Sequence, residues 1–155
     1  MSYHIRRATL ADAPALAEVI RGLGLFAHIK AEKPKTTRER VARHLALCLN
    51  DDSHAVYVAE ETTGEIVGYV SAHWLPYLIL AGSEGYVSEL FISESARGQG
   101  IGSQLLDVIK ADARHHGCAR LMLLNMRQRE SYQRGYYQKV GWEERPEAAN
   151  FIFKL

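Results

Sequence analysis

A glycine-rich turn at residues 97–103 combines residue types that suit the binding of an anion. It follows an aromatic and β-branched run, 86–92, which predicts a strand, and precedes apolar residues that cluster at helical spacing from Leu105 onward. The first backbone N–H groups of a helix have no partner inside the helix and lie at the positive end of its dipole. Glycine lets the backbone approach an anion closely, and Arg97 and Ser103 add a positive charge and a hydroxyl donor. The turn is therefore a candidate cradle for a pyrophosphate.

The spacing of the glycines distinguishes between phosphate-binding motifs. The turn has the pattern G-x-G-x-G, whereas a Rossmann turn needs G-x-G-x-x-G and a P-loop needs a lysine before its serine. It resembles instead the R/Q-x-x-G-x-G/A signature of the GNAT superfamily of N-acetyltransferases, which bind acetyl-coenzyme A there. A turn that binds nothing is the alternative. The resemblance implies that acetyl-CoA is held by Arg97, Gly98, Gln99, Gly100, Ile101, Gly102 and Ser103.

A second segment, residues 136–142, resembles the F/L-Y-x-K-x-G-F pattern that the superfamily carries near its C-terminus. Acetyl transfer from a thioester to an amine needs a neutral amine, donors for the oxyanion and a proton for the departing thiolate. A tyrosine hydroxyl stays protonated at neutral pH and can donate that proton. The resemblance implies that Tyr137 is the general acid and that Tyr136 packs the helix on the sheet. Packing alone is the alternative for both rings.

The same resemblance implies further contacts with coenzyme A. Relatives often carry an asparagine seven residues before the tyrosine, where this chain has a glutamate. Ser131 or Asn125 could take over its role, or no residue does. The pantetheine arm is expected to pair, as an added strand would, with the backbone of Leu90, Phe91 and Ile92.

Glu89 is the candidate for the base because it is a carboxylate inside the central strand. Period-two alternation predicts that its side chain shares a face with Val87 and Phe91. In many relatives an acidic residue at or next to this position deprotonates the amine or orders a water that does so. Here Ser88 stands where some relatives have that acid, so binding of a cationic substrate or pairing with an arginine is the alternative for Glu89.

The order of predicted elements is β-α-α-β-β-β-α-β-α-β-β, a mixed α/β arrangement. This is also the order of the GNAT fold, so we expect one domain, residues 1–155, with a mixed central sheet flanked by helices. A capping box at Thr9–Asp12 and another at Thr36–Glu39 should begin the first two helices. The expected strands are 4–8, 54–60, 66–74, 84–92, 119–125, 142–145 and 151–155, and the expected helices are about 10–23, 36–49, 100–116 and 129–140.

Composition narrows the class of protein. The chain has 155 residues, 47% of them hydrophobic and 24% charged, and a formal net charge of +1, which argues against nucleic acid or an acidic membrane as the main partner. Cys48 and Cys118 lack C-x-x-C spacing and should be buried reduced thiols, and no histidine spacing suggests a metal. The N-terminus lacks the apolar core of a signal peptide, and no segment is apolar enough to span a bilayer, so we expect a cytoplasmic protein.

These features together predict an acetyl-CoA-dependent N-acetyltransferase that uses no metal and transfers the acetyl group directly, in a ternary complex, to a primary amine of a small molecule. A protein or peptide amine acceptor, and a regulatory module that binds acyl-CoA without turnover, are the alternatives. The resemblance places the acceptor near the connector 24–35, where His28, His73, Trp74 and Tyr77 could line a cleft. The apolar loop 75–82 could also line it, or form the contact of a homodimer.

Overall fold

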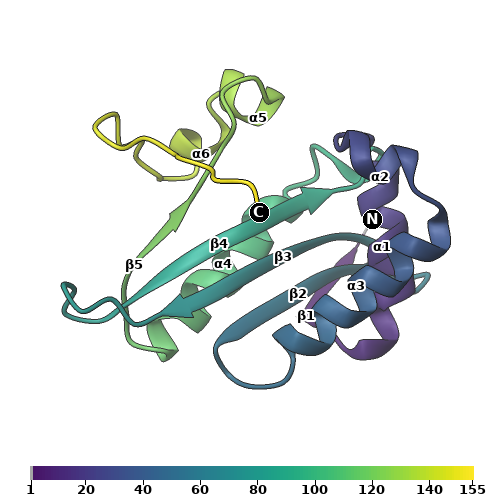
Figure 1. The fold of residues 1–155 in the computed structure, drawn as a ribbon, viewed down its shortest axis with the longest axis horizontal. Helices are drawn as coiled ribbons and strands as arrows, with labels where there is room; N and C mark the ends of the chain where they lie inside the picture. Colours follow the sequence, from purple (N-terminus) through teal and green to yellow (C-terminus); the bar gives the residue numbers. More distant parts are fainter. Residues whose placement is uncertain (1) are drawn as a thin grey trace. The chain divides into compact units, whose positions relative to one another are not determined.

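A computed structural model describes residues 2–155, in which the chain forms two compact units, Met1–Leu123 and Leu124–Leu155. The first unit contains a five-stranded sheet with the order β1-β2-β3-β4-β5 (Figure 1). The pairs β1–β2, β2–β3 and β3–β4 are antiparallel, whereas β5 is parallel to β4. The strands are β1 (Tyr3–Arg7), β2 (His54–Glu61), β3 (Ile66–Leu75), β4 (Ser83–Ile92) and β5 (Cys118–Leu123).

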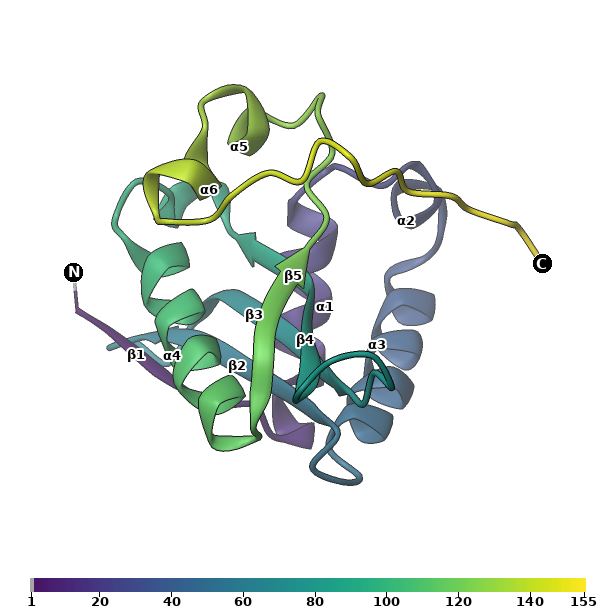
Figure 2. The ribbon, with the colours of Figure 1, turned by 90° about the vertical axis from the view of Figure 1, so that its left-hand side faces the viewer.

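Helices cover both faces of this sheet, with α1 and α3 on one face and α4 on the other (Figure 2). Because the central strand β3 is covered on both sides, its residues are almost all buried rather than alternating. On α4, residues at helical spacing form the stripe that packs on the sheet: Ile101, Leu105, Leu106 and Ile109, each at most 1% exposed. The helices of this unit are α1 (Ala13–Gly22), α2 (Ala27–Ala31), α3 (Pro34–Cys48) and α4 (Ile101–His115), with short 3-10 turns at Leu10–Asp12 and Glu94–Ala96.

The connection from β4 through α4 to β5 fixes the position of the glycine-rich turn. Parallel strands need a crossover, here made by α4, and the chain enters that helix directly after the carboxyl end of β4. The turn at 97–100 therefore lies where β4 ends and α4 begins. Gly117 closes α4 with φ +68°, as the sequence predicted.

The region before β2 differs from the prediction. The connector 24–35 contains the short helix α2, and α3 begins at Pro34 rather than at a capping box on Thr36. Proline suits the first turn of a helix because its missing N–H would have no partner there. The predicted capping box at Thr9–Asp12 is present, although it caps a 3-10 turn that leads into α1.

The second unit lacks the predicted long helix and final strands. Residues 129–140 form two short helices, α5 (Glu130–Gln133) and α6 (Tyr136–Lys139), because Gly135 adopts φ +65° between them. The strands predicted at 142–145 and 151–155 are wrong: within residues 2–155 no strand follows β5. An extended segment needs a partner strand for its backbone groups, and the side chains of the last segment are exposed instead: Phe151, Ile152, Phe153 and Leu155.

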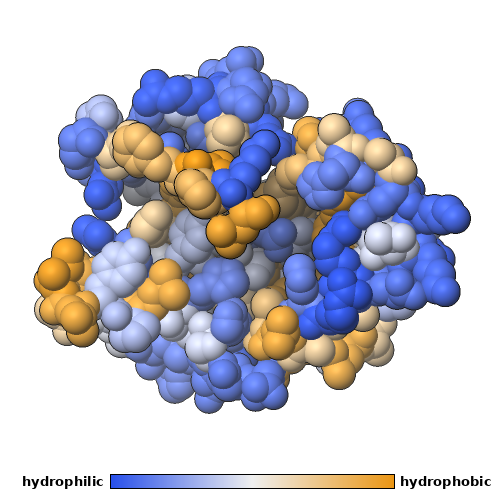
Figure 3. Space-filling model, viewed as in Figure 1, coloured by the Kyte–Doolittle hydropathy of each residue, from blue (hydrophilic) through white to orange (hydrophobic). Residues whose placement is uncertain are grey.

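The loop between β3 and β4 carries exposed apolar side chains. Leu78 and Ile79 are among the most exposed hydrophobic residues of the chain, at 103% and 88%. Figure 3 shows an apolar cluster at its left edge, where Figure 1 places this loop. Contiguous exposed apolar surface is common at protein contacts.

A buried carboxylate joins β1 to the start of α1. Asp12 is 7% exposed and accepts two hydrogen bonds of 2.9 Å from the Arg6 guanidinium and one of 2.7 Å from the Thr9 backbone N–H. The Arg6 Nε–H also donates to Glu60 on β2, at 2.7 Å. The hydrogen bonds from Arg6, and secondarily from Thr9, hold the pKa of Asp12 below its usual value despite its burial.

We expect Asp12→Asn to lower the free energy of unfolding by about 3 kcal/mol at pH 7, because it removes the carboxylate that accepts two hydrogen bonds from the partly buried Arg6 guanidinium and leaves Glu60 as its only charged partner. A carboxyl group whose pKa is depressed in the folded state stabilises the protein above its unfolded pKa, roughly 3.9, and loses that effect as the pH falls through its folded pKa. Urea unfolding at pH 7 and pH 3 should therefore show a smaller difference between variant and wild type at pH 3.

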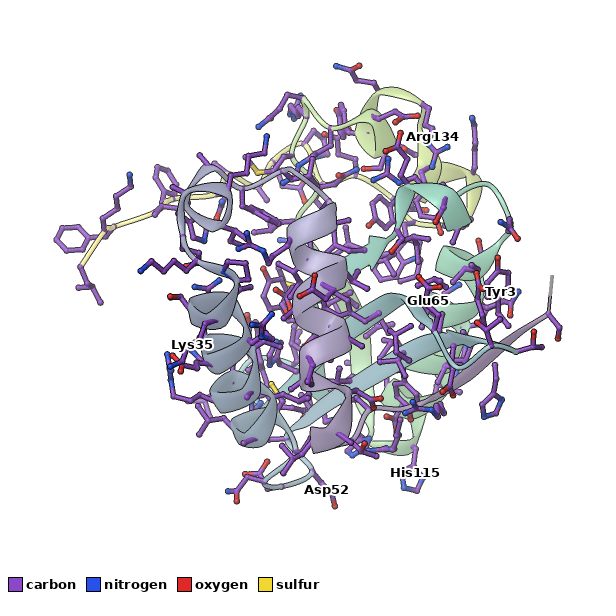
Figure 4. All side chains as sticks on the ribbon, turned by 90° about the vertical axis from the view of Figure 1, so that its right-hand side faces the viewer. Tyr3, Lys35, Asp52, Glu65, His115 and Arg134 are labelled. Carbon is purple, nitrogen blue, oxygen red and sulfur yellow. The ribbon has the colours of Figure 1, made fainter. Side chains whose placement is uncertain are left out.

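The matched control is Glu39→Gln, which removes an exposed ion pair between the Lys35 Nζ and the Glu39 Oε1, 3.7 Å apart. Lys35 is labelled in Figure 4. An exposed pair contributes little, so this variant should change the free energy of unfolding by about 0.5 kcal/mol or less. Equal effects of the two variants would contradict a structural role for the Asp12 network.

Candidate active site

The glycine-rich turn adopts a backbone conformation that needs glycine. Gly98 and Gly100 have φ values of +75° and +77°, in the left-handed region that other residues rarely adopt. A Cβ added at either position would meet no atom within 4 Å, so conformation rather than crowding requires glycine. Residues 97–100 are exposed, whereas the flanking Ala96 and Ile101 are each only 1% exposed. Two buried anchors thus hold the turn while its backbone faces open space.

Side chains of the first unit fix the ends of this turn. The Gln99 Oε1 accepts a hydrogen bond of 2.7 Å from the Tyr3 hydroxyl on β1. The Arg97 Nε–H donates to the Ile92 carbonyl at 3.3 Å, so the guanidinium lies beside the end of β4. Inside α4, the Gln104 N–H bonds the Gly100 carbonyl at 3.1 Å, and the N–H groups before it belong to the anion-attracting first turn of the helix.

The strand β4 has an edge that its neighbour β5 does not cover. Pairing between the two strands ends at Val87 with Leu123, although β4 continues to Ile92. On its other side β4 stays paired with β3 through residues 68–70. The backbone of Leu90, Phe91 and Ile92 is thus not paired with β5 in the described sheet, which is the condition for pairing with an extended ligand.

A β-bulge in β4 corrects the predicted orientation of Glu89. Ser71 and Ala72 are adjacent on β3, but their partners on β4, Glu89 and Val87, are two residues apart. Ser88 is therefore the extra residue of the bulge. The prediction that Glu89 shares a face with Val87 is wrong, because the extra residue reverses the alternation. Phe91 and Glu89 do share a face, since no irregularity separates them.

Glu89 lies beside a buried tyrosine on this face. Tyr69 is only 3% exposed, and its hydroxyl donates a hydrogen bond to the Glu89 carboxylate. Part of the Glu89 side chain reaches solvent, yet the surrounding protein raises the pKa of its carboxyl group, and the hydrogen bond from Tyr69 offsets this only in part. Burial, and secondarily the charge of Glu89, raise the pKa of the Cys48 thiol on α3. Glu89 therefore lies on the face of the sheet that α3 covers.

Aromatic side chains lie along the same face of β4, from its carboxyl end to its middle. Phe26, next to the start of α2, contacts Phe91 edge to face with ring centroids 5.8 Å apart, and the His28 ring is 6.2 Å from Phe26. His73 lies on this face and bonds Ser88, with Nε2 and Oγ 2.7 Å apart. These contacts place the start of α2 beside the carboxyl end of β4, and the binding of the acceptor near the connector 24–35 stays a prediction.

Trp74 does not belong to this group. Its ring stacks on His116 at the end of α4, at 5.0 Å, on the opposite face of the sheet. The sequence did not predict Tyr69 as a site residue, nor the bond between Ser88 and His73. His73 had a weak signal as an isolated histidine near the expected cleft, whereas Tyr69 had none.

In the second unit, Tyr137 lies on α6 among other rings. Its ring centroid is 5.0 Å from that of Tyr136 and 6.2 Å from that of Trp142, and the Trp142 N–H bonds its carbonyl at 2.9 Å. Burial, with a smaller effect of Tyr136, raises the pKa of Tyr137 to about 12. The hydroxyl is thus protonated at neutral pH, as a general acid must be.

The two residues proposed to replace the missing asparagine are bonded to each other. The Ser131 hydroxyl donates to the Asn125 Oδ1 at 3.0 Å. Because Asn125 follows β5 and Ser131 lies on α5, this bond closes the loop between the two elements. The pair is a local unit that presents a hydroxyl and an amide together.

No group of three histidine, cysteine, aspartate or glutamate side chains among residues 2–155 is arranged to hold a metal ion. None of the described helices has the length and apolar character needed to cross a membrane.

The chain belongs to the acetyltransferase (GNAT) family, whose model matches residues 23–142. Its relatives include the L-methionine sulfoximine/L-methionine sulfone acetyltransferase of Pseudomonas paraeruginosa, 28% identical over 92% of this chain and 81% of that protein. Glucosamine 6-phosphate N-acetyltransferase 1 of Oryza sativa is 29% identical over 93% of this chain and 83% of that protein. Acetyltransferase Atu2258 of Agrobacterium fabrum is 32% identical, but the match spans only 64% of this chain and 62% of the relative.

Solved structures share the fold. A transcriptional regulator from Bacillus halodurans C-125 has a TM-score of 0.82 and is 26% identical, over 98% of this chain and all of that one. Glucosamine-6-phosphate N-acetyltransferase from Arabidopsis thaliana has a TM-score of 0.78 at 18% identity, over 99% and 100% of the two chains. The comparisons confirm the family, the mixed α/β fold and the enzyme class, N-acetyltransferase, that the sequence predicted.

Proposed function

We propose that the protein transfers the acetyl group of acetyl-CoA directly, in a ternary complex, to a primary amine of a small molecule. The observation that carries this is the exposed left-handed turn at Gly98 and Gly100, which leads into α4 beside the uncovered edge of β4. Such a turn suits a pyrophosphate, and such an edge suits an extended arm with amide groups. Relatives named for small amines, among them methionine sulfoximine and glucosamine 6-phosphate, support the acceptor class.

The proposed reaction needs few protein groups. The neutral amine attacks the thioester carbonyl, the intermediate collapses, and Tyr137 gives its hydroxyl proton to the departing thiolate. Glu89 has two proposed roles: it takes a proton from the amine, or it holds the ammonium form by charge. Asn125 and Ser131, with the turn at 97–103, are proposed to bind coenzyme A.

Two further features belong to the same proposal. The exposed side chains of Leu78 and Ile79 support a homodimer contact at the loop between β3 and β4 (Figure 3). A near-neutral charge and the absence of C-x-x-C spacing support a cytoplasmic location.

Calorimetric titration with acetyl-CoA, followed by a thiol-release assay on a panel of amines, tests the proposal. Binding together with turnover on a small amine is the expected result. Binding with turnover only on peptide amines would move the acceptor to proteins, and binding without any turnover would indicate a regulatory module. Failure to bind acetyl-CoA would overturn the proposal.

A further inference from the structure

The extra residue of the β4 bulge carries a hydroxyl that faces an imidazole. The Oγ of Ser88 lies 2.7 Å from the Nε2 of His73 and 3.4 Å from the Ser71 carbonyl oxygen. The contact with His73 has the length of a good hydrogen bond, and the contact with the Ser71 carbonyl is weak. We therefore assign the Ser88 hydroxyl as a donor to the Nε2 of His73. His73 then has its Nε2 lone pair directed at Ser88.

The surroundings of His73 favour its neutral form. The His54 ring on β2 meets the His73 ring edge to face, with centroids 4.8 Å apart, and the Tyr86 ring on β4 is 6.1 Å away. Burial, and secondarily the neighbouring His54, lower the pKa of His73 from its usual 6.5. Near pH 7 the imidazole is thus able to accept a proton.

The far side of the histidine pair reaches solvent. The His54 Nδ1 bonds the Ser53 hydroxyl at 2.7 Å, and the Ser53 backbone N–H and hydroxyl both donate to the Asp51 carboxylate. His54 also lines an open hollow of about 390 Å³ together with Cys48 and the loop 49–52, in which Figure 4 labels Asp52. His73 is itself only partly buried and its neighbour His54 borders this open hollow, so a proton on His73 can leave to water.

We infer that Ser88 and His73 deprotonate the acceptor amine. Glu89, the residue after Ser88, attracts the ammonium form of the acceptor by its negative charge before this step. This inference rests on the proposed function. Ser88 would contact the amine, and His73 is a positioning residue that holds the proton. The pair thus takes the step for which the sequence offered Glu89 as the candidate.

The protons balance over one turnover. The ammonium gives one proton to the Ser88 oxygen as the Ser88 hydroxyl proton passes to the Nε2 of His73. The amine nitrogen then bonds the acetyl carbon, and the bond between that carbon and sulfur breaks as Tyr137 gives its proton to the thiolate. The second nitrogen proton restores Tyr137, and His73 releases its proton to solvent. One amide, one thiol and one free proton result.

The pH dependence has a defined sign. Protonated His73 cannot accept a proton, so kcat should fall as the pH drops through the pKa of His73, below 6.5. The titratable groups around this pair are His54 from β2, Tyr86 and Glu89 from β4, the latter next to Ser88 in the chain, and Asp51, which bonds His54 through Ser53.

The test measures kcat and KM against pH, with an amine found in the panel, for the wild type, His73→Gln, Ser88→Ala and Glu89→Gln. His73→Gln should lower kcat roughly 10²-fold at pH 7 and remove the fall of kcat at acidic pH, and Ser88→Ala should do the same. Glu89→Gln should raise the KM for the amine and keep that fall. Unchanged acetyl-CoA affinity shows that each variant is folded.

His54→Gln separates this role from a merely structural one. Removing the neighbouring imidazole should raise the pKa of His73, so the fall of kcat should move to higher pH. Titration of the His73 ring by NMR should show the same shift without any substrate.

Each contrary result has a separate meaning. The inference is overturned if Glu89→Gln removes the acidic fall of kcat while His73→Gln keeps it, or if intact-mass measurement finds an acetyl group on Ser88. A wild type that binds acetyl-CoA but acetylates no amine overturns the proposed function, and this inference with it.

Discussion

Gly100→Glu should abolish the binding of acetyl-CoA while the protein remains folded. The φ of +77° makes any side chain at this position cost about 1–2 kcal/mol, but a Cβ there meets no atom within 4 Å. The new carboxylate would stand at the N-terminal end of α4, where the pyrophosphate is proposed to bind. Two negative charges about 4 Å apart near a protein surface repel by roughly 4 kcal/mol, a loss of roughly 10³-fold in affinity, measured by calorimetric titration.

The matched control for this variant is Gly117→Glu. Gly117 also has a positive φ, +68°, and open space around its Cβ position, but it follows the other end of α4. A helix of this length separates the two glycines by about 22 Å, so the same change there should cost stability and leave the affinity for acetyl-CoA unaltered. Gly100→Ala, which adds strain without charge, should have an intermediate effect. An unaltered affinity in Gly100→Glu would refute the cradle.

Tyr137→Phe should lower kcat roughly 10²-fold or more, with little effect on the affinity for acetyl-CoA. The change removes one hydroxyl and keeps the ring that packs near Tyr136 and Trp142. Because the pKa of Tyr137 is about 12, the wild type should keep its proton donor up to about pH 10 and lose it only as the pH rises through 12. Steady-state kinetics between pH 6 and pH 10 would check both expectations.

Tyr136→Phe is the control for the loss of a neighbouring hydroxyl. Tyr136 precedes Tyr137 on α6 and is expected to pack rather than to donate a proton, so its variant should keep kcat within a few-fold of the wild type. If Tyr137→Phe turned over an amine as fast as the wild type, another group would have to protonate the thiolate, and the assignment of the acid would be wrong.

The sequence by itself determined the parts of this protein that depend on local conformation. The glycines at 98, 100 and 102 predicted a tight turn, and the apolar stripe after them predicted α4, because backbone freedom and helical periodicity are properties of neighbouring residues. The strands of the sheet followed from aromatic and β-branched runs in the same way. Together with the resemblance of the turn and of residues 136–142, these were sufficient to predict the family.

Only the tertiary structure decided features that depend on register and pairing. Counting residues in β4 could not reveal the bulge at Ser88, and that single extra residue places Glu89 on the face opposite Val87. Helical periodicity at 129–140 did not reveal the break at Gly135, and apolar composition at 151–155 could not supply a partner strand. The bonds from Tyr69 to Glu89 and from Ser88 to His73 join neighbouring strands. Such contacts exist only once the register between strands is set, and no local pattern in the chain encodes that register.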